Sequence, residues 1–228
     1  MNAAAFPPGI FAPLPVVEGG FQCVVADVPS RFRSNSKAKP GRNAIRHYNC
    51  HSMPTIASLP VRNVVARNAF LWFWTTGPLI AIGAHIPVIR AWGFEPTAMG
   101  FVWVKLNPKA PSLWFGERDL FFGPGLTTRK NAEYVVLCRR GHPERLAKDV
   151  FEIIVAPRRQ HSRKPTEVYR RIERYCVGPR LDLFACERRN GWIPYGAEID
   201  KYAARDVWAG APSRGVGGDC WHDGGTRL

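Results

Sequence analysis

Six short apolar segments recur along the chain, and they constrain its fold more than any other feature of the sequence. Each is rich in β-branched or aromatic residues and is bounded by glycine, proline or charged residues, which is typical of a β-strand. Near-continuous apolar strands that alternate with helical patterns favour a sheet covered on both faces. The sequence therefore predicts an α/β fold with a mostly parallel sheet, whose strands span 21–26, 70–75, 98–105, 133–138, 151–155 and 180–184.

Two helices are expected between these strands. Residues 165–175 place apolar side chains at four- and three-residue spacing, with arginines on the other faces. Residues 78–92 form the second candidate, in which Pro87 would kink or shorten the helix.

The remaining segments indicate one domain with two extensions. Residues 1–18, rich in Ala and Pro, are predicted to be an extended lead-in, residues 19–200 the domain, and residues 201–228 a poorly ordered tail. Residues 106–131 form a long irregular segment, and loops of that length in a compact domain are usually functional. Neither a signal peptide nor a membrane-spanning run is visible, so we expect a cytoplasmic protein. The six cysteines show no C-x-x-C pair, so no metal is expected.

The balance of charge is unusual for a domain of 228 residues. Lys and Arg number 32 against 18 Asp and Glu, which gives a formal net charge of +14. An excess of this size favours a polyanionic partner, and nucleic acid is the commonest one. A basic surface that only keeps the protein in solution is the alternative interpretation.

A carboxylate and a proline directly follow the first predicted strand, in the segment Asp27-Val28-Pro29-Ser30. In open α/β sheets the ends of the strands are where ligands bind. Taken alone, however, the segment is more typical of a turn that ends a strand than of a catalytic site.

Segments spread over most of the chain give Asp27 a more specific interpretation. They include Arg-His-Tyr at 46–48, Leu-Trp-Phe-Trp-Thr at 71–75, Trp-Val-Lys at 103–105, Ser-Arg-Lys-Pro at 162–165 and Leu-Phe-Ala at 183–185. In this order, from about residue 21 to 198, the chain resembles the MT-A family of adenine methyltransferases, named after the seventy-kilodalton subunit of the messenger-RNA enzyme. The bacterial and phage branch is the most similar. The resemblance implies a Rossmann-like class I S-adenosylmethionine-dependent methyltransferase fold with permuted motif order.

The resemblance also implies a catalytic site and a cofactor site. Asp27, Val28, Pro29 and Ser30 occupy the position of the family's D-P-P-W signature, with the second and fourth letters changed. Lys164 is implied to contact the carboxylate of the cofactor's methionine part. The other cofactor-binding residues expected are Phe184, Cys186, Arg188 and Glu198. Two positions depart from the family, because Cys186 replaces its usual arginine and Ala197 its usual asparagine.

The function implied is methyl transfer from S-adenosylmethionine to the exocyclic amino group of adenine in DNA, or alternatively in RNA. The alternative is an inactive homologue that binds nucleic acid, because Ser30 offers no ring on which a base could stack. The protein is expected to be a monomer or a dimer. Basic side chains expected to contact nucleic acid, each of which could also be plain surface, are Arg31, Arg33, Lys37, Lys39, Arg42, Arg129, Arg158, Arg159 and Arg163.

Overall fold

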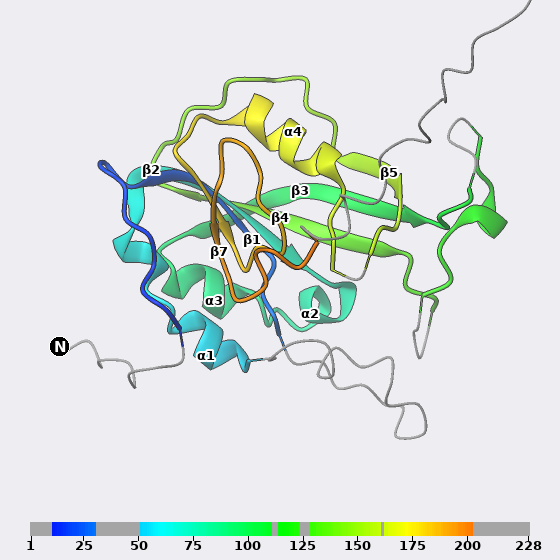
Figure 1. Cartoon of the computed structure of the whole chain (residues 1–228), viewed down its shortest axis with the longest axis horizontal. Helices are drawn as coiled ribbons and strands as arrows, with labels where there is room; N and C mark the ends of the chain where they lie inside the picture. Colours follow the sequence, from blue (N-terminus) through cyan, green and yellow to red (C-terminus); the bar gives the residue numbers. More distant parts are fainter. Residues whose placement is uncertain (1–10, 31–50, 111–113, 124–127, 161, 203–228) are drawn as a thin grey trace, which may run out of the picture.

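The computed structural model describes residues 11–30, 51–110, 114–123, 128–160 and 162–202 (Figure 1). Within these residues, seven strands form one sheet in the order β5-β3-β4-β2-β1-β6-β7. Four of the six strand pairs are parallel, while β4 runs antiparallel to both β2 and β3. The prediction of an α/β fold with a mostly parallel sheet is thereby confirmed. The strands are β1 (Phe21–Ala26), β2 (Val65–Thr75), β3 (Glu95–Leu106), β4 (Ala132–Arg140), β5 (Ile153–Pro157), β6 (Arg180–Leu183) and β7 (Ile193–Tyr195).

Helices cover both faces of the sheet, as Figure 1 shows. On one face, α4 (Thr166–Tyr175) buries Val168, Tyr169 and Ile172 against the sheet's tryptophans. On the other face lie α1 (Met53–Ala57), α2 (Gly77–Ala81) and α3 (Ile86–Ala91), and the apolar side chains of α1 and α3 belong to a second buried cluster. The central strands are therefore buried on both sides, which explains their uninterrupted apolar sequence. None of the described helices is long and apolar enough to cross a membrane.

The structure refines the helix predicted over residues 78–92. It forms two short helices, α2 and α3, separated by a turn in which Gly83 adopts a left-handed conformation with φ of 65°. Pro87 lies in the first turn of α3, where its missing N–H costs nothing. The second predicted helix is present as α4, which begins at 166, one residue later than predicted, and ends at 175 as predicted. Two elements, α1 and β7, were not predicted.

The exposed edge of the sheet, strand β5, is blocked by an arginine of α4. The side chains of Phe151, Ile153 and Val155 are 79%, 54% and 41% exposed, so one face of this strand is open to solvent. Nη1 of Arg171 donates to the carbonyl oxygens of Phe151 and Ile153 at 2.6 and 2.8 Å. Because these carbonyls are already bonded, the edge is a poor template for another strand.

Candidate active site

Four charged residues from distant parts of the sequence meet at the edge of the sheet where strands β1, β2 and β3 end. Asp27 follows β1, Lys105 is the penultimate residue of β3, and Lys164 precedes α4. Glu133 is the second residue of β4. Because β4 is antiparallel to its neighbours, its beginning lies at the same edge as the ends of β2 and β3. The antiparallel strand therefore brings a carboxylate to the edge where ligands bind in folds of this class.

These residues form a charge row, defined as Lys105, Glu133, Lys164 and Asp27. Nζ of Lys164 lies 2.9 Å from Oδ2 of Asp27 and 2.9 Å from Oε2 of Glu133. Lys105 donates to the other carboxylate oxygen of Glu133. Each ammonium group also lies against an indole ring, at 4.8 Å for Lys164 over Trp74 and 4.9 Å for Lys105 over Trp103. Positive and negative charges therefore alternate along the row, and each of its two ammonium groups contacts a tryptophan ring.

The charge row shifts the pKa values of its members in opposite directions. Burial alone would raise the pKa of Glu133, but the two lysines outweigh it and lower that pKa to about 2. Burial would lower the pKa of Lys164, but the carboxylates of Asp27 and Glu133 raise it well above its usual range. The pKa of Asp27 is raised by burial and by the charge of Glu133, against the effect of Lys164. Lys164 is therefore a permanent cation, and Asp27 is the most readily protonated carboxylate of the row.

The turn after Asp27 is tied to the start of α1. The carbonyl of Val28 accepts from the N–H of Ser30 at 2.8 Å, and that of Pro29 accepts from the N–H of His51 at 2.8 Å. Ser30 is only 3% exposed and pairs with His51 in an isolated parallel bridge. Asp27, Val28 and Pro29 line a cavity, whereas Ser30 is not among its lining residues. A carbonyl oxygen has two lone pairs, so that of Val28 can still accept a second hydrogen bond.

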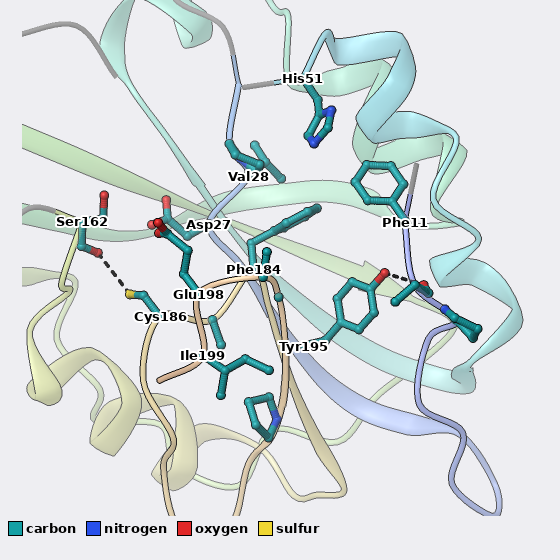
Figure 2. A pocket seen from close by; sticks show the side chains of 17 residues that line it. Phe11, Asp27, Val28, His51, Ser162, Phe184, Cys186, Tyr195, Glu198 and Ile199 are labelled. Atoms are coloured by element: carbon teal, nitrogen blue, oxygen red, sulfur yellow. Dashed lines mark hydrogen bonds between the residues drawn. The ribbon is translucent and has the colours of Figure 1, made fainter. Parts of the chain in front are cut away.

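The cavity beside Asp27 has a volume of about 680 Å³. Figure 2 shows Asp27 and Val28 on one side of it, Phe11 and Tyr195 on the other, and Phe184 between them. A volume of this size lies within the usual range for small-molecule sites, about 300–1,000 Å³. The walls are mostly apolar, with the carboxylates of Asp27 and Glu198 as charged groups among the lining residues.

The N-terminal segment supplies one wall of this cavity. Phe11 packs edge-to-face on His51 and on Phe184, with ring centroids 5.1 and 6.1 Å apart. The hydroxyl of Tyr195 donates to the carbonyl of Ala12 at 2.6 Å and holds the segment in place. Sequence reasoning did not identify Phe11, because nothing local in residues 11–18 indicates that they return to the end of β6.

Three of the predicted cofactor residues line the cavity, and two do not. Phe184, Cys186 and Glu198 are lining residues, and Phe184 adopts an unusual φ of 62°. Burial raises the pKa of Cys186 to about 11, so this side chain is a neutral thiol. Lys164 lies behind Asp27 in the charge row. Arg188 points to the surface, where it pairs with Asp200 at 2.8 Å.

The predicted nucleic-acid contacts divide into three groups. Arg129 and Arg158 lie over phenylalanine rings of the irregular segment. Arg159 and Arg163 lie 4.0 and 2.7 Å from the carboxylate of Glu187, and Arg163 is 7% exposed. The remaining five lie outside the described residues: Arg31, Arg33, Lys37, Lys39 and Arg42.

Two members of the charge row, Lys105 and Glu133, were missed by sequence reasoning. Both lie at the ends of predicted strands, where a charged residue usually means only that the strand has reached solvent. The signal that could have identified them is a charged residue on each of two adjoining strands at one sheet edge. Among the described residues, no group of three or more His, Cys, Asp or Glu side chains is arranged to hold a metal ion.

Comparisons with known proteins show the family to which this chain is similar. A family model described as MT-A70 matches residues 21–198. The type II methyltransferase M.MunI of Mycoplasma sp is 30% identical over 147 residues, which cover 63% of this chain and 56% of that protein. The METTL3 catalytic subunit of the Homo sapiens N(6)-adenosine-methyltransferase is 28% identical over 141 residues, 60% of this chain and 23% of that protein.

The chain thus spans about half the length of the Mycoplasma protein and about a quarter of the human one. The family match, in contrast, covers most of this chain and includes Asp27, Glu133, Lys164 and Glu198. The expected resemblance is therefore confirmed, and the chain belongs to the MT-A70 family.

Proposed function

We propose that this chain is a methyltransferase that transfers a methyl group to the exocyclic amino group of adenine in DNA. Methyltransferases of the MT-A70 family use S-adenosylmethionine. The observation that carries the proposal is a carboxylate, Asp27, that faces a cavity of ligand size and is paired with a buried lysine. The carboxylate of this pair can accept a hydrogen bond from the amino group of adenine, while the part of the cavity away from Asp27 holds a cofactor.

The cavity walls fit S-adenosylmethionine chemically. The rings of Phe11, Phe184 and Tyr195 offer apolar surface for an adenosine group. The carboxylate of Glu198 can accept hydrogen bonds from ribose hydroxyls, although it already accepts one from Lys201 at 2.7 Å. Lys164 is not among the lining residues, so it acts on this cavity through its ion pair with Asp27. When bound, the cofactor supplies an electrophilic methyl group on a sulfonium centre.

Asp27 and Val28 would prepare the adenine for this chemistry. The lone pair of the adenine amino group is delocalised into the ring, so the nitrogen is a poor nucleophile. A carboxylate that accepts one amino N–H, with the free lone pair of the Val28 carbonyl accepting the other, would hold the nitrogen closer to tetrahedral. Lys164 favours the ionised form of Asp27, which is the form that accepts. Methyl transfer would leave the nitrogen with one proton too many, and the carboxylate of Asp27 would accept it.

A non-catalytic, nucleic-acid-binding homologue is the second candidate. The observation that favours it is Ser30, which is buried outside the cavity and provides no aromatic face for the target base. Loss of one stacking contact lowers affinity or rate by about 10- to 100-fold.

Calorimetric titration with S-adenosylmethionine, followed by a methyl-transfer assay on adenine-containing DNA and RNA, tests the proposal. We expect binding of the cofactor, and incorporation of methyl groups into DNA in preference to RNA. Salt-sensitive binding of DNA by a protein that gives no heat with S-adenosylmethionine would establish the non-catalytic homologue instead.

Phe11→Ala is expected to weaken the binding of S-adenosylmethionine by about 10-fold, because it removes one aromatic wall of the cavity. Calorimetric titration measures the effect. Val16→Ala is the matched control, since Val16 belongs to the same segment but is 80% exposed. Equal cofactor affinity in the two variants would show that Phe11 is not part of the site.

A further inference from the structure

An arm extends from the active-site edge of the sheet between β3 and β4, and it is drawn in green beyond the ends of these strands in Figure 1. We define the aromatic arm as the described residues 107–110, 114–123 and 128–131. Its base is bonded to the sheet, since Leu120 pairs with Leu106 and the N–H of Phe121 donates to the carbonyl of Lys105 at 2.8 Å. The side chain of Asn107 donates to the carbonyls of Arg118 and Leu120 at 3.3 and 3.1 Å. These bonds fix the base of the arm beside Lys105 of the charge row.

Aromatic side chains are exposed on this arm. Trp114 is 86%, Phe122 69% and Phe115 47% exposed. Among the described residues, Phe151 is the one other exposed Phe or Trp, so three of the four lie on the arm. Large apolar rings in water are unfavourable, and their concentration on one segment marks a surface that a partner covers.

Two arginines lie on rings of the same arm. The guanidinium of Arg129 is 4.2 Å from the ring centroid of Phe122, and that of Arg158 is 4.5 Å from that of Phe121. Phe122 remains mostly exposed beside Arg129, so its ring is still accessible. Arg158 directly follows β5, on the segment that leads to Lys164. The cations are therefore fixed among the rings at the edge that carries the candidate active site.

The chemistry of this surface selects its partner. A protein interface would be favoured by rings alone, but rings that alternate with guanidinium groups match a strand of nucleic acid, whose bases stack and whose phosphates are anionic. Paired bases in a duplex are already stacked, so exposed rings gain most from unpaired bases. The net charge of +14 adds long-range attraction for the same polyanion.

We propose that the aromatic arm binds unpaired nucleotides that flank the target adenine, with bases stacked on Phe122 and Trp114 and phosphates bound by Arg129 and Arg158. This inference rests on the proposed function, because it assigns the strand that delivers the adenine to Asp27. The arm adds a stacking surface outside the catalytic turn, in which Ser30 provides no aromatic ring.

The test measures fluorescence anisotropy of two labelled single strands of about 16 nucleotides, the upper end of a typical single-strand site. One strand carries bases, and the other has the same phosphates but abasic sugars. Phe122→Ala and Trp114→Ala in the full chain should each weaken binding of the base-bearing strand by about 5- to 100-fold and leave the abasic strand unaffected. Phe151→Ala is the matched control, since it removes an equally exposed ring before the start of β5.

Other outcomes would overturn the inference. They are unchanged affinity of the arm variants, equal losses for both strands, or a change in oligomeric state by sedimentation, which would make the arm a protein interface. A titration with S-adenosylmethionine on the same proteins separates the two proposals. The wild type could bind the cofactor and transfer methyl groups while the arm variants bind the base-bearing strand as tightly as the wild type does. That result would refute the proposal for the arm and leave the proposed function standing. Absence of cofactor binding refutes the proposed function, and the strand measurements still decide what the arm binds.

Discussion

Replacement of Asp27 by asparagine is expected to lower the rate of methyl transfer by about 100- to 1,000-fold, the usual effect of losing one group that stabilises the transition state. Asparagine is nearly the same size, so the cavity keeps its shape. Its amide oxygen is a weaker acceptor than a carboxylate oxygen, and its NH₂ group would face the amino group it should hold. The measurement is single-turnover methyl transfer to adenine-containing DNA at saturating S-adenosylmethionine.

Asp182→Asn is the matched control for Asp27→Asn. Asp182 lies on β6 and is 3% exposed, and its Oδ2 accepts from the hydroxyl of Tyr169 at 3.1 Å. An amide oxygen can accept that bond as well, and burial already raises the pKa of Asp182 to about 7. We expect wild-type rates from Asp182→Asn. Comparable rates from both variants would remove Asp27 from the chemistry.

Lys164→Ala is expected to destabilise the protein by about 3 kcal/mol at neutral pH, since removing one partner of a buried pair leaves uncompensated charge. Two carboxylates lose their shared cation in this variant, although solvent moderates the loss because their side chains are 31% and 21% exposed. Denaturant unfolding of wild type and variant gives the difference. Lys105→Ala is the control, because it removes the cation at the end of the row, whose ion pair among the described residues is with Glu133 alone.

The effect of Lys164→Ala should depend on pH with a defined sign. The pKa of Glu133 is lowered from 4.5 to about 2 in the folded protein. Its ion pairs therefore stabilise the wild type fully above pH 4.5, and this stabilisation is lost as the pH falls toward 2. The two proteins should thus converge in stability below pH 4. A constant difference from pH 7 to pH 3 would mean that lost packing, rather than lost charge, destabilises the variant.

Most of the sheet could be predicted because most of its strands have a recognisable local sequence pattern. Each of the six expected segments overlaps a strand, since burial on both faces requires a run of apolar residues. The strand β7 was missed because Ile-Pro-Tyr is too short, and proline argues against a strand. The expected helix at 78–92 divided because Gly83 takes a left-handed turn, which a hydrophobic pattern does not reveal.

The site was predictable only in part, for a different reason. Asp27 follows its own strand, so the local sequence places it at the sheet edge. Glu133 reaches that edge because β4 is antiparallel to its neighbours. Hydrophobic periodicity does not reveal the direction of a strand. Phe11 reaches the cavity through contacts with His51 and Phe184, both remote in sequence. The missed residues are those whose position depends on the packing of the whole chain.

The position of β1 between β2 and β6 has a consequence for folding during synthesis on the ribosome. Cys23 of β1 pairs with Arg180 of β6, so β1 is synthesised well before a strand with which it pairs. Until β6 emerges, one edge of an apolar strand stays open, and the cavity lacks Phe184, Tyr195 and Glu198. Contacts so distant in sequence slow folding and leave partly folded chains prone to association. Truncated chains that end before β6 should therefore be aggregation-prone and lack the site.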